Sequence, residues 1–215
     1  MAYTFAALKT KLQTQIGDPN LNDSVMGDAL NYTEQALFNT FDLTLNSDQD
    51  TNYVVEGTNE LSNDMPGDFQ RVSSLYVVSP TGTSEDLTEY FLPIKDFRRQ
   101  FPLPSIQGNS SLRWWSYWTS IVFSNNANVT YTVVMDYIKD IPLMSATTDV
   151  PTIPQAFEEL LMLGAKLRIY EQKEDFDYAS QFTNRYADLQ EAFVLRYSTR
   201  QVDNQIVVPG ARNRV

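Results

Sequence analysis

"VPTIPQAFEELLMLGAKLRIYEQKEDFDYASQF", residues 150–182, is the stretch that decides the fold. Two prolines open it, a long apolar-periodic run follows, and a charged break at residues 171–177 precedes a second periodic run. Apolar residues that recur every three or four positions indicate helices. The stretch therefore predicts two antiparallel helices joined by a polar turn.

The first of these helices, expected over residues 155–172, is apolar on more than one side. One stripe holds Phe157, Leu160, Leu161, Gly164, Leu167 and Arg168, whereas Met162, Leu163 and Ile169 lie off it. A helix of this kind must be covered on more than one side. Either a β-rich part of the chain or a neighbouring subunit can supply the second cover.

The second helix carries a narrower apolar seam, with the alternating three- and four-residue steps of a coiled coil. Its members are Ala179, Phe182, Tyr186, Leu189, Phe193 and Tyr197. We expect this hairpin to form a wall between subunits. The predicted interface residues on it are Phe157, Leu161, Met162, Ile169, Phe182, Tyr186 and Phe193.

Outward from the hairpin, the beginning of the chain predicts two more helices. Residues 4–16 place Phe5, Leu8 and Leu12 on one stripe, and the turn at residues 17–19 ends it. Asn22 or Asp23 can then cap a helix that runs to about Phe41. We expect both helices to contribute to the core.

From about residue 50 the apolar period changes to two, and β-branched and aromatic residues become frequent. This pattern predicts strands at residues 51–57, 69–80 and 85–92. Residues 93–102 predict a short helical or irregular crossing. Residues 116–124 and 129–138 predict the two arms of a hairpin around a turn.

Helices at both ends with strands between them indicate an α+β fold rather than alternating βαβ units. We expect a helical core made from the N-terminal and C-terminal helix pairs, with an inserted antiparallel β-rich region and an extended C-terminal tail. The expected boundaries are 1–48 for the N-terminal helices, 49–148 for the β-rich insertion, 149–198 for the C-terminal helical hairpin, and 199–215 for the tail.

The composition excludes most catalytic sites. The 215 residues include no cysteine and no histidine, which removes thiol nucleophiles, thiolate metal sites and the commonest general base. Adjacent acids such as Glu158 and Glu159 face different directions on a helix and make a poor hydrolase pair. We therefore expect no enzyme, no cofactor and no metal. No apolar run approaches the length of a membrane span, so we expect no membrane partner.

The charge is unevenly distributed over a chain whose net charge is −11. Residues 1–90 carry 3 basic and 14 acidic side chains, whereas residues 196–215 carry four arginines against one aspartate. An acidic body repels nucleic-acid phosphates. Within it, Arg98 and Arg99 form a small basic spot, which we expect to donate ion pairs to a neighbouring subunit.

All three tryptophans, Trp114, Trp115 and Trp118, lie in "LRWWSYWTS", residues 112–120. Aromatic rings can stack on sugars or single-stranded nucleic acid, so a carbohydrate- or receptor-binding module is the alternative function. A subunit interface or the chain's own core would also use these rings. The sequence leaves these three interpretations open.

Three stretches resemble phage head-to-tail adaptor (connector) proteins, most closely the tail-tubular-protein-A type of short-tailed phages. They are "MPGDFQRVSSLYVVSPTGTSEDLTEY", "IVFSNNANVTYTVVMDYIKDIPLMS" and "VPTIPQAFEELLMLGAKLRIYEQKEDFDYASQFTNRYADLQEAF". The patterns are structural rather than chemical, and their order along the chain carries the likeness. The usual proline between the two arms of the hairpin is replaced by Asn125-Asn126-Ala127-Asn128.

The resemblance implies a non-enzymatic virion protein at the head–tail junction, assembled in the host cytoplasm. It would form a homo-oligomeric ring, a dodecamer in this family, between the portal protein and the tail tube or nozzle protein, with tail fibres as a further partner. Double-stranded DNA would pass through the ring without specific binding.

The resemblance also implies roles for two sets of residues. The C-terminal tail would dock on the portal through Gln205, Ile206, Val207, Val208, Pro209, Arg212 and Arg214. Trp114, Trp115 and Trp118 would contact the tail or a fibre.

Overall fold

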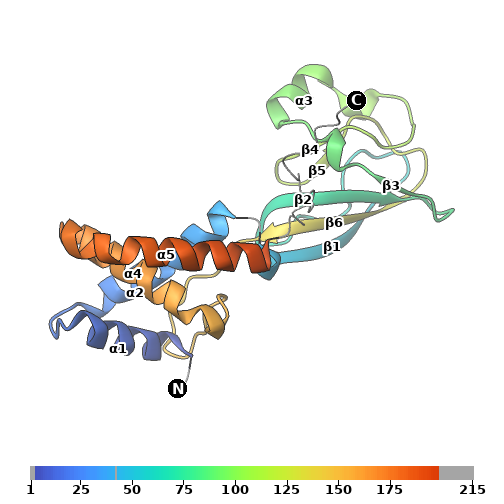
Figure 1. Ribbon diagram of the computed structural model, residues 1–215. Coiled ribbons are helices and arrows are strands. Elements are labelled where there is room, and N and C mark those ends of the chain that lie inside the picture. The colour runs from blue at the N-terminus through green and yellow to red at the C-terminus, as the bar shows by residue number, and fades with distance from the viewer. Residues whose placement is uncertain (1–2, 42, 199–215) are drawn as a thin grey trace, which may run out of the picture. The chain divides into compact units, whose positions relative to one another are not determined.

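The computed structural model describes residues 3–41 and 43–198, and it confirms the α+β class (Figure 1). The chain divides into two compact units. Among the described residues, the helical unit comprises 3–41, 43–45 and 141–198, and the β-rich unit comprises 46–140. The insertion was predicted to span residues 49–148, so both of its boundaries lie earlier in the chain than expected.

Four α-helices build the helical unit. They are α1 (Phe5–Ile16), α2 (Asp23–Thr40), α4 (Glu158–Gln172) and α5 (Phe176–Tyr197). The side chains of Thr4, Asn22 and Asp175 cap α1, α2 and α5 by accepting backbone N–H groups that the first helical turn leaves free. The helix ends predicted from the sequence agree with these bounds to within a few residues.

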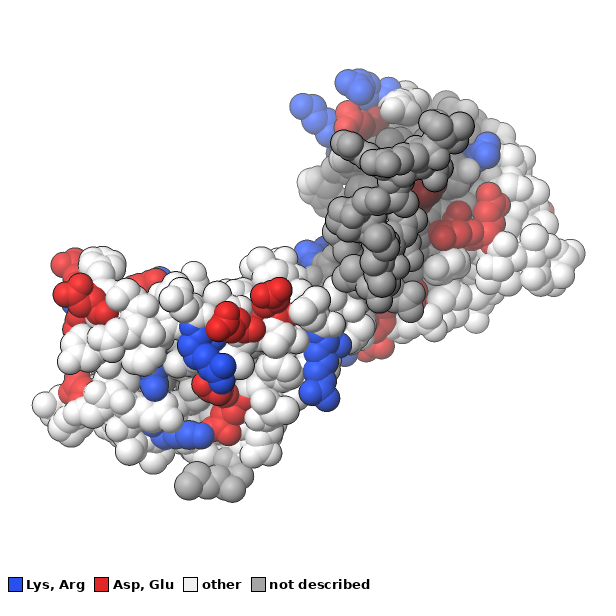
Figure 2. Space-filling view, in the orientation of Figure 1, with Lys and Arg blue, Asp and Glu red and all other residues white. Residues whose placement is uncertain are grey.

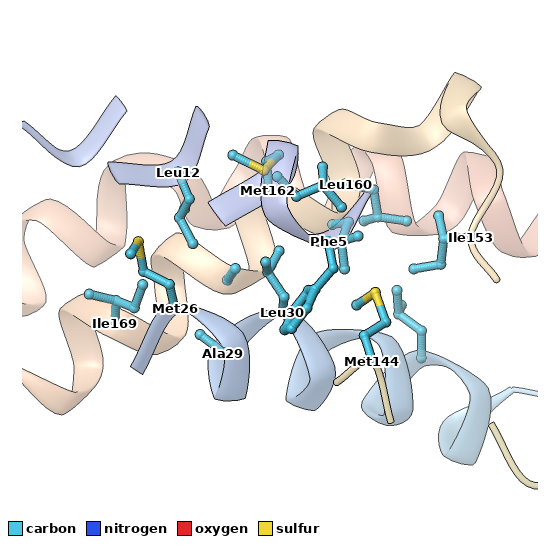
Figure 3. Close-up of a cluster of buried hydrophobic side chains, with 14 of the residues drawn as sticks. Phe5, Leu12, Met26, Ala29, Leu30, Met144, Ile153, Leu160, Met162 and Ile169 are labelled. Carbon is cyan, nitrogen blue, oxygen red and sulfur yellow. The ribbon is translucent and has the colours of Figure 1, made fainter. Parts of the chain in front are cut away.

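Helix α4 packs against α1, α2 and α5, and this arrangement explains its apolar excess. All six residues from Leu160 to Ala165 are buried. Figure 3 shows side chains of this core, with Phe5, Leu30 and Leu160 among those that meet in it. The chain's own helices therefore supply the cover that was expected from a β-rich segment or a neighbouring subunit.

At Gly164, α4 closely approaches side chains of two other helices. A Cβ atom at this position would lie 2.3 Å from Thr33 Cγ2 on α2 and 2.9 Å from Tyr186 Cε2 on α5. Only glycine leaves room for both neighbours.

The segment after residue 140 belongs to the helical unit because two polar side chains of α2 hold its backbone. Asn31 donates to the carbonyl of Met144 and accepts its N–H, both at 3.0 Å. Glu34, which is buried, accepts the N–H groups of Thr152 and Ile153 at 2.5 and 3.1 Å. These bonds account for the earlier end of the β-rich unit.

The β-rich unit is built on a four-stranded antiparallel sheet in the order β1-β6-β2-β3. Its strands are β1 (Ser47–Val54), β2 (Phe69–Val78), β3 (Ser84–Asp86) and β6 (Tyr131–Lys139). Along β6, Tyr131, Val133 and Met135 are buried while the residues between them are half-buried. This alternation confirms the prediction, made from the period of two, that these three residues share one face of the strand.

Two predictions for this unit were wrong. The expected hairpin between residues 116–124 and 129–138 does not form, because β4 (Trp115–Tyr117) pairs with β5 (Ile121–Phe123) around a tight turn. β6 lies instead between β1 and β2. The strand expected over residues 85–92 ends at Asp86, and a 3₁₀ turn (Thr88–Tyr90) follows it.

Residues 93–102 contain a short helix, α3 (Ile94–Gln100), which begins after Pro93. Phe97 is its buried anchor, whereas Lys95, Arg98 and Arg99 are exposed. α3 contacts β4, so the basic side chains are held on an ordered element rather than on a loop. This helix positions the pocket described below.

Candidate interaction surfaces

Within the described part of the chain, no group of three or more Asp or Glu side chains is arranged to hold a metal ion. The helices described there are also too short or too polar to cross a membrane. The candidate sites are interaction surfaces. They are described first for the helical unit and then for the β-rich unit.

The structure corrects the interface predicted on the terminal hairpin. Leu161, Met162, Ile169 and Phe193 are at most 3% exposed and belong to the core of the helical unit. Phe157 and Tyr186 are half-buried and pack against the same core. Leu161, Met162, Ile169 and Phe193 are so enclosed by their own helices that they present almost no surface to a second copy.

Phe182 lies instead in an aromatic patch at the turn between α4 and α5. Tyr170 stacks on Tyr178 and on Phe182, with ring centroids 5.6 and 6.0 Å apart. Lys166 lies 5.3 Å from the Phe182 ring, and Phe176 nearby is 65% exposed. Stacked, partly exposed rings with a cation are typical of contact surfaces.

A second apolar surface of the helical unit lies on α5. A pocket of about 300 Å³ is lined by Phe41 and by the α5 residues Ala187, Gln190, Glu191, Val194 and Leu195. Leu195 points to solvent with 68% of its side chain exposed. Tyr186, Leu189, Phe193 and Tyr197 of the periodic seam that the sequence indicated pack in or against the core, so this surface lies outside that part of the seam.

The three tryptophans do not share one role. Trp115 is 2% exposed, and its Nε1–H donates to the carbonyl of Leu87 at 2.6 Å. Trp114 is half-buried and packs edge-on against Tyr90. Trp118 alone is open to solvent, with 66% exposure. The prediction of a common tail or fibre contact is therefore wrong for Trp115, and these residues form no three-ring platform.

Trp118 lines a pocket of about 360 Å³ between α3 and the β4–β5 turn, here called the α3 pocket. Its apolar wall includes Ile94, Phe101, Pro102 and Pro104. The guanidinium of Arg98 lies 5.4 Å from the Trp118 ring at the rim. Aromatic and arginine side chains are enriched at protein interfaces, where a partner often inserts a side chain into a pocket. The α3 pocket has both kinds of residue around one concave surface.

Basic charge gathers beside this pocket. Figure 2 shows Lys and Arg side chains over α3, and three of the six basic residues of the β-rich unit are Lys95, Arg98 and Arg99. The same unit carries 12 acidic residues, a balance of −6. Arg99 forms an ion pair with Asp96 at 3.3 Å, and Glu60 lies in the pocket wall.

Acidic charge gathers elsewhere in the unit, around β1 and β6. Asp136 on β6 accepts hydrogen bonds from Gln49 and Ser74. Burial, with Asp68 and further aspartates nearby, raises the pKa of Tyr137 to about 12. This surface repels anions rather than binding them.

The sequence identified Arg98, Arg99 and Trp118 but not the pocket that Arg98 and Trp118 both line. The available signal was "FPLP", residues 101–104, where prolines and exposed apolar residues alternate directly after a basic helix. The portal-docking residues Gln205, Ile206, Val207, Val208, Pro209, Arg212 and Arg214 lie outside the described residues.

Comparison with known proteins gives one family. No curated protein sequence matched the chain. The family model of the SU10 adaptor protein matches residues 3–210, which is nearly the whole chain. This family is structural rather than a class of enzymes. The chain belongs to the SU10 adaptor protein family, and is thus a phage adaptor protein of the virion's head–tail junction.

Proposed function

We propose that this adaptor forms a ring of identical copies, a dodecamer, that joins the capsid portal to the tail and extends the DNA channel. The observation that carries the proposal is the match to the adaptor family over residues 3–210. The tail tube or nozzle protein is the proposed partner on the far side of the ring, and the order of the sequence patterns, which resembles the tail-tubular-protein-A type of short-tailed phages, supports this choice. Tail fibres are a further partner.

The surfaces of both units support a role in assembly. Each unit has its own core, and apolar side chains remain exposed outside these cores, among them Phe176, Leu195 and Trp118. Exposed apolar patches in a folded chain mark sites of protein contact. A ring needs two different, complementary surfaces on every copy.

The acidic body supports a conduit for DNA. A net charge of −11 offers duplex phosphates few contacts, so DNA can slide past without being held. The basic tail carries the opposite charge and is proposed to dock on the portal instead.

The test is to image the full chain alone and with the portal protein of the same phage by negative-stain microscopy. We expect closed rings seated on the portal. A variant that lacks residues 199–215 should keep its circular dichroism spectrum but fail to bind the portal. Full portal binding by this variant would contradict the docking role of the tail, and the lack of rings in both samples would contradict the ring itself.

A further inference from the structure

The β2–β3 hairpin is a rigid acidic projection of the β-rich unit. Its turn is closed by bonds from the N–H of Ser79 to the carbonyl of Thr83 and from the N–H of Gly82 to the carbonyl of Ser79, both at 2.9 Å. Pro80 is exposed in the turn, and Glu85, Asp86 and Glu89 are exposed behind it. A preordered turn loses little conformational entropy when it binds.

The hairpin and the α3 pocket are complementary in charge and in the kinds of side chain that they present. The pocket offers Trp118 and two prolines beside Lys95 and Arg98, and the hairpin offers an exposed proline followed by carboxylates. A proline ring can lie against an indole face, while the carboxylates reach the basic residues at the rim. Among the described residues, Glu85 and Glu89 have no ion-pair partner of their own chain.

One copy cannot bring these two surfaces together. Figure 1 shows the β2–β3 hairpin and α3 at different ends of the β-rich unit. Both belong to the same compact unit, so their separation does not depend on how the two units are placed. Two complementary surfaces at different ends of one unit generate a head-to-tail contact between copies.

We propose that the β2–β3 hairpin of one copy docks in the α3 pocket of the next copy. Pro80 packs against Trp118 and Pro102, and Glu85 pairs with Arg98. This inference rests on the ring of identical copies proposed above and names one of its contacts.

Charge reversal tests the contact in the full chain. Arg98→Glu and Glu85→Arg should each reduce the assembled fraction at least tenfold, since like charges then face one another. The matched controls are Arg113→Glu and Asp64→Arg, which reverse exposed charges of the same unit outside both surfaces. Mass photometry measures the assembled fraction with and without portal, and thermal melts check that all four variants keep the wild-type fold.

Mixing the two disabled variants gives the decisive result. An Arg98→Glu copy then has two acidic surfaces and a Glu85→Arg copy has two basic ones, so every contact in an alternating ring is complementary. The mixture should assemble although neither variant does so alone, and misfolded variants could not produce this rescue. Failure of the mixture to assemble would overturn the proposal.

A covalent test uses the absence of cysteine from the chain. Pro80→Cys combined with Trp118→Cys should give a ladder of disulfide-linked oligomers under oxidising conditions, and neither single variant should give that ladder. If rings form but the double variant gives no ladder, or if the Arg98→Glu variant forms rings as well as wild type does, the hairpin contact is overturned while the ring stands. A wild-type chain that never self-associates, with or without portal, would overturn both.

Discussion

Glu34 is a buried carboxylate in the middle of a helical core. Burying its charged form costs free energy, which nearby hydrogen-bond donors must offset. It accepts two backbone N–H groups, from Thr152 and Ile153, which stabilise the charged form. Burial outweighs them and raises the pKa of Glu34 above its ordinary 4.5. The folded chain therefore binds this proton more tightly than the unfolded chain does.

The sign of the pH dependence follows from that difference. The contribution of Glu34 to stability is fully present below pH 4.5, and it is lost as the pH rises through the raised folded-state pKa. Glu34→Gln keeps an oxygen acceptor but cannot ionise. We expect the free energy of unfolding of wild type, relative to this variant, to fall between pH 4.5 and neutrality. Urea titrations across this range measure it, and parallel curves would contradict the prediction.

Trp115 and Trp118 lie three positions apart, yet substitution should affect them very differently. Trp115→Ala opens a cavity beneath β4 and leaves the carbonyl of Leu87 without its donor, which should cost about 3–5 kcal/mol. Trp118→Ala removes an exposed ring and should change stability by no more than about 0.5 kcal/mol. Chemical denaturation of both variants checks this, and equal losses would place Trp118 in the core.

At the level of helices, the crossing at Gly164 controls how closely α4 approaches α2 and α5. Gly164→Ala forces its Cβ against Thr33 and Tyr186, and the helices must move apart. We expect a loss of about 1–3 kcal/mol, seen as a lower Tm. Gly108→Ala is the control, because a Cβ there meets no atom within 4 Å. An unchanged Tm for Gly164→Ala would mean that the helices can separate without loss of packing.

Sequence periodicity predicted the helices well because their apolar spacing and caps are local signals. Gly17 and Asn22 marked helix ends that the structure contains. The pairing of β6 was missed because partner choice in a sheet depends on strands far apart in the chain, and the tight turn at residues 118–120 carries no glycine.

The interface residues were misplaced for a related physical reason. Composition shows that α4 is apolar on several sides, but it cannot show whether its own chain or another copy covers them. In the structure, α1, α2 and α5 of the same chain pack against α4, and Leu161, Met162 and Ile169 are buried. The exposed pair Arg98 and Trp118 was named from the sequence, whereas the pocket between them needed the path of residues 101–104.

At the scale of the whole molecule, charge decides how the adaptor meets DNA. We expect the full chain to bind random duplex DNA more weakly than about 10⁻⁴ M at physiological salt, because its net charge of −11 opposes the phosphates. Fluorescence anisotropy with a labelled duplex measures this, and lowering the salt should strengthen the repulsion rather than reveal binding. Tighter binding that Arg212→Ala/Arg214→Ala abolishes would assign DNA contact to the tail. Tighter binding that remains in this double variant would mean that residues outside the tail bind DNA, which would contradict a passive conduit.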